Sequence, residues 1–303
     1  MMNQHILITG ATGMLGKHLT DTLLKQGHKV SVLARKPTAI SNVNVYLWDV
    51  NKGQIDASCL NGVDTIMHLA GENIAKERWT EKRKQEIIDS RVLSVRLLFK
   101  TLATHKNEVK NFISAAAVGF YGDRGDEILT EDSAPGQGFM ADCCVKWENA
   151  IDEGKKPGVR IVKIRTGVVL AKDDGALPQM AQPINLFVGA PLGSGNQWIP
   201  WIHYKDMTAV YTHVLENDNL EGVYNACAPF PVTNKALTKA IAKQLHRPVW
   251  PFGVPEKVMK LILGEMSAVV LSSTNTSAQK LLSTDFIFQY THLDDALTNI
   301  YNS

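Results

Sequence analysis

Three glycines near the start of the chain, Gly10, Gly13 and Gly16, have a spacing that suits phosphate binding. They follow an apolar run and open a segment whose leucines recur at helical spacing. The first glycine permits a sharp turn, the second lets backbone N–H groups approach an anion, and the third allows close packing of helix on strand. The pattern favours a dinucleotide pyrophosphate site at a helix N-terminus over a merely structural turn. The residues expected there are Gly10, Thr12, Gly13, Met14, Leu15 and Gly16.

The end of the next predicted strand, residues 29–34, indicates which dinucleotide binds. A site that selects NAD usually places Asp or Glu there to accept a hydrogen bond from the adenosine ribose, whereas this chain has Arg35 and Lys36. Two cations favour a 2′-phosphate, so we expect NADP(H), with NAD(H) as the less favoured cofactor. The alternative is that Arg35 and Lys36 form only a solvated turn.

Alternating strands and helices must position these residues. The further runs of β type are 43–48, 65–69, 112–116 and 160–165, with helical stretches between them. The longest helix is expected over residues 80–105. This alternation predicts an α/β fold, a Rossmann-type doubly wound parallel sheet whose ligands bind at the carboxyl edge of the strands.

Beyond residue 165 the alternation loosens, and glycine and proline become frequent. We therefore expect a Rossmann domain over residues 1–166, to which residues 201–228 return. Residues 167–200 and 229–303 should form a smaller C-terminal substrate-binding lobe. Asp206 suits a helix start. The helices expected in this half are 207–215, 234–245, 255–263 and 293–301.

Composition excludes several classes of function. The chain has 303 residues, 45% of them hydrophobic, and a formal net charge of +2, so neither nucleic acid nor a membrane surface is an expected partner. The four cysteines and nine histidines lack metal-ligand spacing, so we expect no metal site. No apolar run has the length of a signal peptide or a membrane span, and a cytoplasmic protein with reduced thiols is expected. A small-molecule substrate is the expected partner, and a homo-oligomer stays open.

Several motifs point to one family. The segment Gly10–Gly16, the turn His68–Gly71 and the segment Trp201–Asp206 resemble those of short-chain dehydrogenase/reductases of the extended, epimerase-like branch. Segments 71–74 and 225–229 resemble an atypical subgroup labelled epimerase family proteins. The resemblance covers nearly the whole chain.

The resemblance also implies roles for individual residues. It places Asp49 on the adenine side of the cofactor, and it assigns Lys146 a contact with the nicotinamide ribose. Arg91 falls where extended members commonly have an asparagine that holds a water chain. A guanidinium there binds an anion, either a cofactor phosphate or a substrate carboxylate. The residues implied along the rest of the cofactor are Leu69, Ala70 and Gly71.

The catalytic segment departs from the family, whose mechanism uses Tyr-x-x-x-Lys and a serine or threonine. Here Asp142 stands at the tyrosine position, four residues before Lys146, and the two form either an ion pair or a substituted acid/base. Alanines occupy the usual hydroxyl position, so Ser114 alone retains a hydroxyl there. Tyr121, on the loop that borders the nicotinamide, is either a replacement proton donor or a packed ring.

A substrate site is expected beside the nicotinamide. Arg78 is either a ligand for a substrate anion or a solvent-exposed loop cation. Aromatic residues of the smaller lobe either wall the pocket or close the hydrophobic core. The residues predicted to bind substrate are Glu72, Arg78, Trp79, Trp198, Trp201 and His203.

Two functions follow from these observations. The first is an NADP(H)-dependent oxidoreductase or epimerase that acts on a small hydroxyl- or carbonyl-bearing metabolite. The second is an NADP(H)-binding regulatory or redox-sensing protein, because the usual tyrosine and serine are absent and resemblance of fold does not establish activity.

Overall fold

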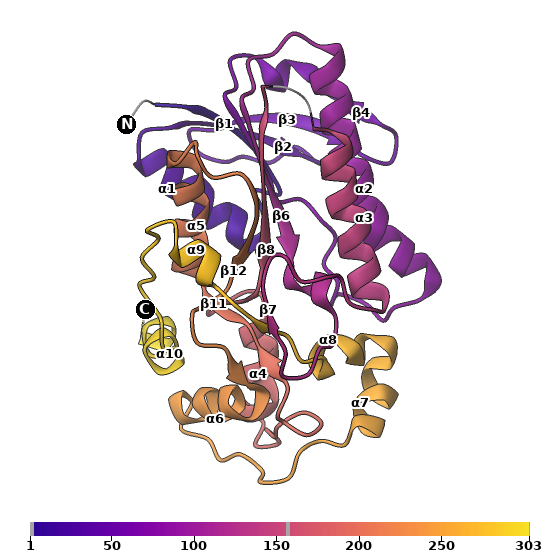
Figure 1. The fold of residues 1–303 in the computed structure, drawn as a ribbon, viewed down its shortest axis with the longest axis vertical. Coiled ribbons are helices and arrows are strands. Elements are labelled where there is room, and N and C mark those ends of the chain that lie inside the picture. The colour runs from indigo at the N-terminus through magenta and orange to yellow at the C-terminus, as the bar shows by residue number, and fades with distance from the viewer. Residues whose placement is uncertain (1–2, 156–157, 303) are drawn as a thin grey trace.

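The computed structural model describes residues 3–155 and 158–302, and its centre is an eight-stranded sheet (Figure 1). The strand order is β12-β8-β6-β5-β1-β2-β3-β4, and all neighbours run parallel except the β3–β4 pair. The strands are β1 His5–Thr9, β2 Lys29–Ala34, β3 Asn44–Asp49, β4 Gln54–Ile55, β5 Thr65–His68, β6 Asn111–Ala117, β8 Arg160–Thr166 and β12 Gly222–Ala226. The predicted fold class, a doubly wound parallel sheet, is confirmed.

Helices cover both faces of this sheet, as Figure 1 shows. One face carries α1 (Met14–Lys25) and α5 (Tyr204–Glu216), and the other carries α2 (Glu81–Thr104) and α3 (Phe139–Glu153). Central strands are buried on both sides, which explains why the middle of β1, Ile6–Ile8, is entirely apolar. The side chain of Thr80 accepts a hydrogen bond from the N–H of Arg83 and so begins α2 at the predicted residue.

The smaller lobe lies below the carboxyl edge of the sheet in Figure 1. Its helices are α4 Ala176–Asn185, α6 Asn234–Gln244, α7 Glu256–Leu263, α8 Ser267–Leu271 and α10 Leu293–Asn302. Helix α9 (Gln279–Leu282) packs instead on the large sheet, where Leu281 belongs to the same buried cluster as Tyr224 and Ala226 of β12. Three short strand pairs join it to the rest: β7 Ile128–Leu129 with β14 Asn275–Thr276, β9 Val168–Leu170 with β11 Trp201–His203, and β10 Trp198–Ile199 with β13 Val232–Thr233. The short 3-10 turns are η1 Ala57–Leu60, η2 Val118–Tyr121 and η3 Gly264–Met266.

Part of the C-terminal region packs on the large sheet and not on the smaller lobe. Phe286 and Phe288 belong to the same buried cluster as Ile6 in β1. The carboxylate of Asp206 accepts hydrogen bonds from the N–H groups of residues 289 and 290, at 2.8 and 3.0 Å. Residues 286–290 therefore pack on the Rossmann domain, although residues 229–303 were predicted to belong to the smaller lobe.

The prediction that Asp206 begins a helix is wrong. Helix α5 already begins at Tyr204, and the ring of His203 accepts a hydrogen bond from the N–H of Lys205 at 3.1 Å. A histidine nitrogen can serve as the helix cap in place of a carboxylate. Asp206 is thereby left free to hold the C-terminal segment.

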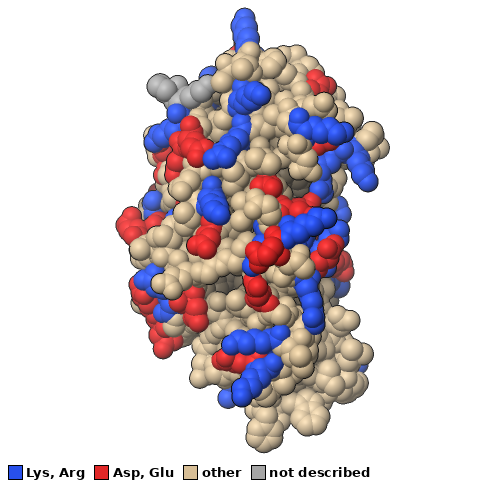
Figure 2. Space-filling view, turned by 90° about the vertical axis from the view of Figure 1, so that its right-hand side faces the viewer, with Lys and Arg blue, Asp and Glu red and all other residues tan. Residues whose placement is uncertain are grey.

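Charges on the molecular surface are mixed. Figure 2 shows Lys and Arg interspersed with Asp and Glu on the side of α2 and α3, above an almost uncharged lower end. Among the described residues, no helix combines the length and hydropathy needed to cross a membrane.

Candidate functional site

The glycine turn after β1 is packed against the turn after β5. Gly10 has φ +73°, and a Cβ there would lie 2.9 Å from the backbone N of Ala70. A Cβ at Gly16 would lie 2.3 Å from the carbonyl oxygen of Gly10. The hydroxyl of Thr9 accepts hydrogen bonds from the N–H groups of Leu69 and Ala70, both at 3.1 Å. Both glycines therefore have the steric roles that their spacing predicts.

Gly13 differs from the other two glycines because its neighbouring space is open. A Cβ there would meet only the carbonyl oxygen of Gly10, at 3.4 Å. Gly13 is the N-cap of α1 and offers no side-chain acceptor. In the described part of the chain, the N–H groups of Met14 and Leu15 have no hydrogen-bond acceptor. A helix N-terminus whose first N–H groups have no acceptor fits a phosphate group.

Arg35 and Glu72 meet across the end of β1. Arg35 follows β2, its side chain is 75% exposed, and it forms an ion pair with Glu72 after β5. The second oxygen of Glu72 lies 3.4 Å from the guanidinium of Arg83. Burial opposes ionisation of Glu72, but the two arginines outweigh it and lower the pKa of the carboxyl. Lys36 beside them is exposed.

Asp49 closes a turn at the end of β3. Its carboxylate accepts a hydrogen bond from the N–H of Lys52 at 3.1 Å and lies 3.5 Å from the ammonium of the same residue. Its carboxylate is 40% exposed. A role on the adenine side of a cofactor stays a prediction.

His68 supports the turn from below. Its ring nitrogens meet the hydroxyl of Thr9 at 2.8 Å and that of Ser94 at 3.1 Å. Full burial, assisted by the charge of Arg91, lowers the pKa of His68 to about 3. His68 therefore links β1, β5 and α2 as a neutral group.

Arg91 lies under the turn that contains Gly71. A Cβ on Gly71 would be 3.3 Å from its guanidinium carbon. The guanidinium donates to the carbonyl oxygens of Ile87 and Glu72, at 3.0 and 3.1 Å, and lies 5.2 Å from the ring centre of Trp147. Burial lowers the pKa of Arg91, and no carboxylate of the described chain forms an ion pair with it. A cation in this setting suits an anionic group at the turn.

Helix α3 presents Asp142 and Lys146 to solvent. The ion-pair alternative for these two residues is wrong, because both are described and they lie beyond ion-pair distance. Two exposed side chains gain little by pairing in water and lose rotamer freedom, which favours separation.

Ser114 and Tyr121 lie in the interior, where neither has exposed surface. The hydroxyl of Ser114 donates to the carbonyl oxygen of Ala115 at 2.9 Å. The phenol of Tyr121 donates to Asn225 at 2.7 Å and accepts from Arg165 at 2.8 Å. Burial raises the pKa of Tyr121 to about 12. Tyr121 is therefore a packed ring in this structure. Its hydroxyl does not lie on an open loop, where a proton donor was the alternative.

Sequence reasoning missed the ion pair that holds Tyr121. Arg165 donates from Nε and Nη2 to both oxygens of Glu148, at 2.8 and 3.0 Å, and the two side chains are only 4% and 5% exposed. Its guanidinium also lies 3.6 Å from the ring centre of Phe120. The sequence could have indicated this pair, because Arg165 is a basic residue at the end of a predicted strand and Glu148 is an acidic residue in the helix before it. The pair fixes α3 to the end of β8.

Arg78 contacts the C-terminal region, whereas Trp79 packs on α3. Arg78 donates to the carbonyl oxygens of Leu261 and Ile262, at 3.1 and 2.6 Å, at the end of α7. Trp79 is 8% exposed and packs edge-on against Phe139, with ring centres 4.7 Å apart. The solvated-cation alternative for Arg78 is incomplete, because its guanidinium binds a helix end whose carbonyls carry negative partial charge.

The aromatic residues of the smaller lobe divide between surface and core. Trp201 and His203 have no exposed surface, and Trp201 belongs to the core cluster of the smaller lobe. His203 stacks on Tyr290 with ring centres 3.9 Å apart. Trp198 is partly exposed and donates from its indole to Asp126 at 2.7 Å. The core alternative therefore holds for Trp201, and His203 is buried beside it.

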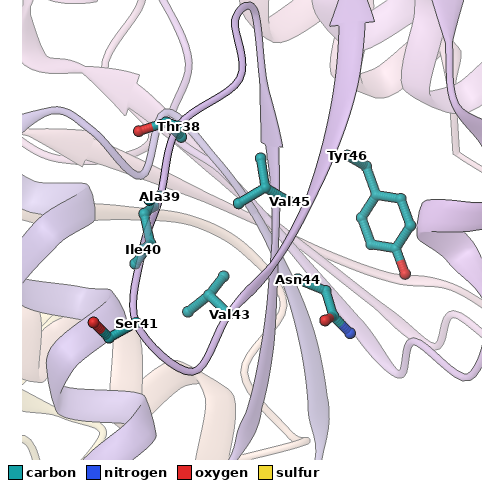
Figure 3. A pocket seen from close by; sticks show the side chains of 8 residues that line it. All are labelled: Thr38, Ala39, Ile40, Ser41, Val43, Asn44, Val45 and Tyr46. Carbon is teal, nitrogen blue, oxygen red and sulfur yellow. The ribbon is translucent and has the colours of Figure 1, made fainter.

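Two cavities lie away from the glycine turn. One, of about 610 Å³, is lined by residues 38–41 and 43–46. In Figure 3 the side chains of Val43 and Val45 point toward the 38–41 segment, and Tyr46 points away. Residues 35–43 contain no helix in the described chain, so the usual crossover helix does not fill this space. The other cavity, of about 860 Å³, lies at the amino edge of the sheet around Arg160.

Comparisons with known proteins agree with this geometry. Residues 6–227 match the sequence model of the NAD dependent epimerase/dehydratase family, and residues 254–300 match a domain of unknown function, DUF1731. The chain is 36% identical over 299 residues to the epimerase family protein YfhF of Bacillus subtilis, which covers 98% of this chain and 97% of that protein. It is 32% identical to the chloroplastic epimerase family protein SDR39U1 homolog of Arabidopsis thaliana, over 97% and 86% of the two chains.

Solved structures show the same likeness. A crystal structure of the human epimerase family protein SDR39U1 (isoform 2) with NADPH has a TM-score of 0.88 and 30% identity, and the match covers 99% of both chains. MoeE5 in complex with UDP-glucuronic acid and NAD has a TM-score of 0.79 over 98% of both chains, but with 18% identity it shares the fold alone.

Proposed function

Because the chain belongs to the NAD dependent epimerase/dehydratase family, we propose that it is an NADP(H)-binding oxidoreductase or epimerase for a small hydroxyl- or carbonyl-bearing metabolite. The observation that carries the proposal is the uncapped N-terminus of α1 behind Gly13, next to Arg35 and Lys36 at the end of β2. The first suits a pyrophosphate and the second a 2′-phosphate. The NADPH in the human SDR39U1 structure supports the same choice.

The chemistry would take place beside α3. When bound, NADP(H) supplies hydride exchange at its nicotinamide. Lys146 is exposed on α3 and is free to contact the nicotinamide ribose. Asp142, one turn earlier on the same helix, stands where the family's tyrosine stands. Arg91, which forms no ion pair within the described chain, would bind a phosphate or a substrate carboxylate.

Calorimetric titration with NADPH and NADH tests this proposal. We expect NADPH to bind at least tenfold more tightly, because a charge-assisted contact is typically worth ~1.5–3 kcal/mol. Arg35→Ala should lose most of this preference. Equal affinity for the two cofactors, or an unchanged affinity of Arg35→Ala for NADPH, would overturn the assignment to NADP(H).

A second candidate is a cofactor-binding protein that senses NADP(H) without turnover. The burial of both Ser114 and Tyr121 favours it, since neither hydroxyl can reach a substrate in this structure. A structure with cofactor and candidate metabolites separates the two. Metabolite density beside the nicotinamide with a donor in reach supports the enzyme, and cofactor-dependent binding of a partner protein without such density supports the sensor.

We also propose a cytoplasmic location for this protein. All four cysteines are buried and unpaired, as is usual where thiols stay reduced. They are Cys59, Cys143, Cys144 and Cys227. Fractionation of cells that express a tagged chain tests the location.

A further inference from the structure

The carboxylate of Glu72 is shared between two arginines that differ in burial. Its Oε1 atom pairs with Arg35, which is 75% exposed, and its Oε2 atom lies 3.4 Å from Nη2 of Arg83, which is 8% exposed. The main chain of Glu72 is held separately, because its N–H donates to Ser90 and its carbonyl oxygen accepts from Arg91. The side chain of Glu72 can therefore change partner while the turn stays in place.

The contact between Arg35 and Glu72 spans the end of β1. Strands β2 and β5 lie on either side of β1, so their ends are about 10 Å apart. An ion pair between residues that follow these two strands must pass the carboxyl end of β1, where the glycine turn begins at Gly10. It closes over the place where the proposed dinucleotide would enter.

Arg83 has an unused position for a carboxylate. Its Nη2 atom donates to the carbonyl oxygen of Asn73 at 2.8 Å, but its Nε atom is buried without a partner. Elsewhere in this chain the same Nε/Nη2 edge binds a carboxylate with both donors, as Arg165 does with Glu148. A buried donor without an acceptor is costly, and a carboxylate that moved fully onto Arg83 would satisfy it.

We propose that Glu72 sets the cofactor preference by competing with a 2′-phosphate for Arg35. Without cofactor, Glu72 bridges Arg35 and Arg83. A 2′-phosphate takes Arg35, and the released carboxylate closes on Nε and Nη2 of Arg83. The inference rests on the proposed NADP(H) site and adds to it a residue that weakens binding of NADPH, since NADH has no phosphate to compete for Arg35.

The test is calorimetric titration of NADPH and NADH into the wild type, Glu72→Gln, Arg35→Ala and the double variant. Glutamine keeps the shape of Glu72 but removes its charge. We expect Glu72→Gln to raise the preference for NADPH over NADH about two- to fivefold, the range that exposed ion pairs contribute. In the double variant this gain should vanish. Glu77→Gln is the matched control, because it removes the same charge from an exposed residue of the same loop, whose ion pair in the described chain is with Lys76.

The outcomes separate the inference from the function. A wild type that binds neither dinucleotide overturns the proposed function and this inference together. A wild type that prefers NADPH while Glu72→Gln shows an unchanged or lower preference overturns the inference alone, as does an equal gain in Glu77→Gln. Circular dichroism confirms that each variant is folded. In a structure with NADPH, the carboxylate of Glu72 should lie within about 3.2 Å of Nε of Arg83, and a Glu72 still paired with Arg35 overturns the exchange.

Discussion

Helix α3 carries two glutamates that make the same bidentate contact in opposite surroundings. Glu148 binds Nε and Nη2 of Arg165, and Glu153 binds Nε and Nη2 of Arg96. The buried pair is 5% and 4% exposed, whereas the surface pair is 53% and 54% exposed. Replacing each glutamate by alanine therefore compares a buried network with a solvated pair, since Glu148 also lies 3.5 Å from the ammonium of Lys163.

The structure fixes the expected size of the difference. Glu148→Ala leaves the charge of Arg165 buried without a carboxylate in the described chain, with hydrogen bonds to the phenol of Tyr121 and one carbonyl oxygen and a contact with the ring of Phe120. Breaking a buried pair in this way costs about 3–5 kcal/mol of unfolding free energy. Glu153→Ala removes a solvated pair, which is worth about 0–1 kcal/mol. The first variant should therefore be less stable than the second by at least ~2 kcal/mol.

Urea unfolding followed by far-ultraviolet circular dichroism measures both differences. The midpoint should fall clearly for Glu148→Ala and little for Glu153→Ala, with similar slopes. Near-equal losses in the two variants would refute the reasoning, because the two arginines bind their glutamates through the same pair of donors, and burial and the added contact with Lys163 both make the loss of Glu148 more costly. Glu148→Gln should lie between them, since the amide still accepts one hydrogen bond.

Three other predictions concern the turn, the helix and the pH dependence. Gly13→Ala should keep the fold but weaken NADPH binding at least tenfold in calorimetry. Gly16→Ala should instead lower the urea midpoint, because its Cβ would lie 2.3 Å from the carbonyl oxygen of Gly10. An unchanged midpoint for Gly16→Ala would contradict this packing. Lys146→Ala should lose more cofactor affinity than Asp142→Ala. A larger loss of affinity in Asp142→Ala would mean that the carboxylate contributes more to cofactor binding than the lysine does. Because the pKa of His68 is lowered to about 3 in the fold, the unfolded chain alone binds that proton between pH 6.5 and 3. Stability should therefore fall in this window by ~1.4 kcal/mol per pH unit from this group, and His68→Gln should flatten the slope measured by urea unfolding.

The hydrophobic period and the residues at element ends predicted individual helices, strands and the glycine turn. The strand at 29–34 and the helices near 80–105 and 234–245 have the predicted positions within one residue. Each has a clear period and a defined end, such as the cap at Thr80. The glycine turn was predictable because its steric demands are met by spacing alone.

Contacts between distant segments were not predictable from those patterns. The family resemblance implied that Tyr121 lies on a loop bordering the nicotinamide, but its hydroxyl is buried and hydrogen-bonded to Arg165 of β8 and Asn225 of β12. Arg78 binds a helix end about 180 residues later in the chain. Such pairings depend on which surfaces meet in the folded chain. The hydrophobic period and the residue spacing within one segment do not predict this.

The position of Phe286 and Phe288 has a consequence for how the chain is made. They complete the core cluster that contains Ile6 in the first strand. A ribosome adds about 5–20 residues per second, so the strand waits roughly 14–56 s for these rings. Until then the part of the large sheet around β1 exposes apolar surface on the growing chain. Contacts of such long sequence separation also form slowly, so we expect this protein to depend on chaperones during synthesis more than a domain whose core is complete early.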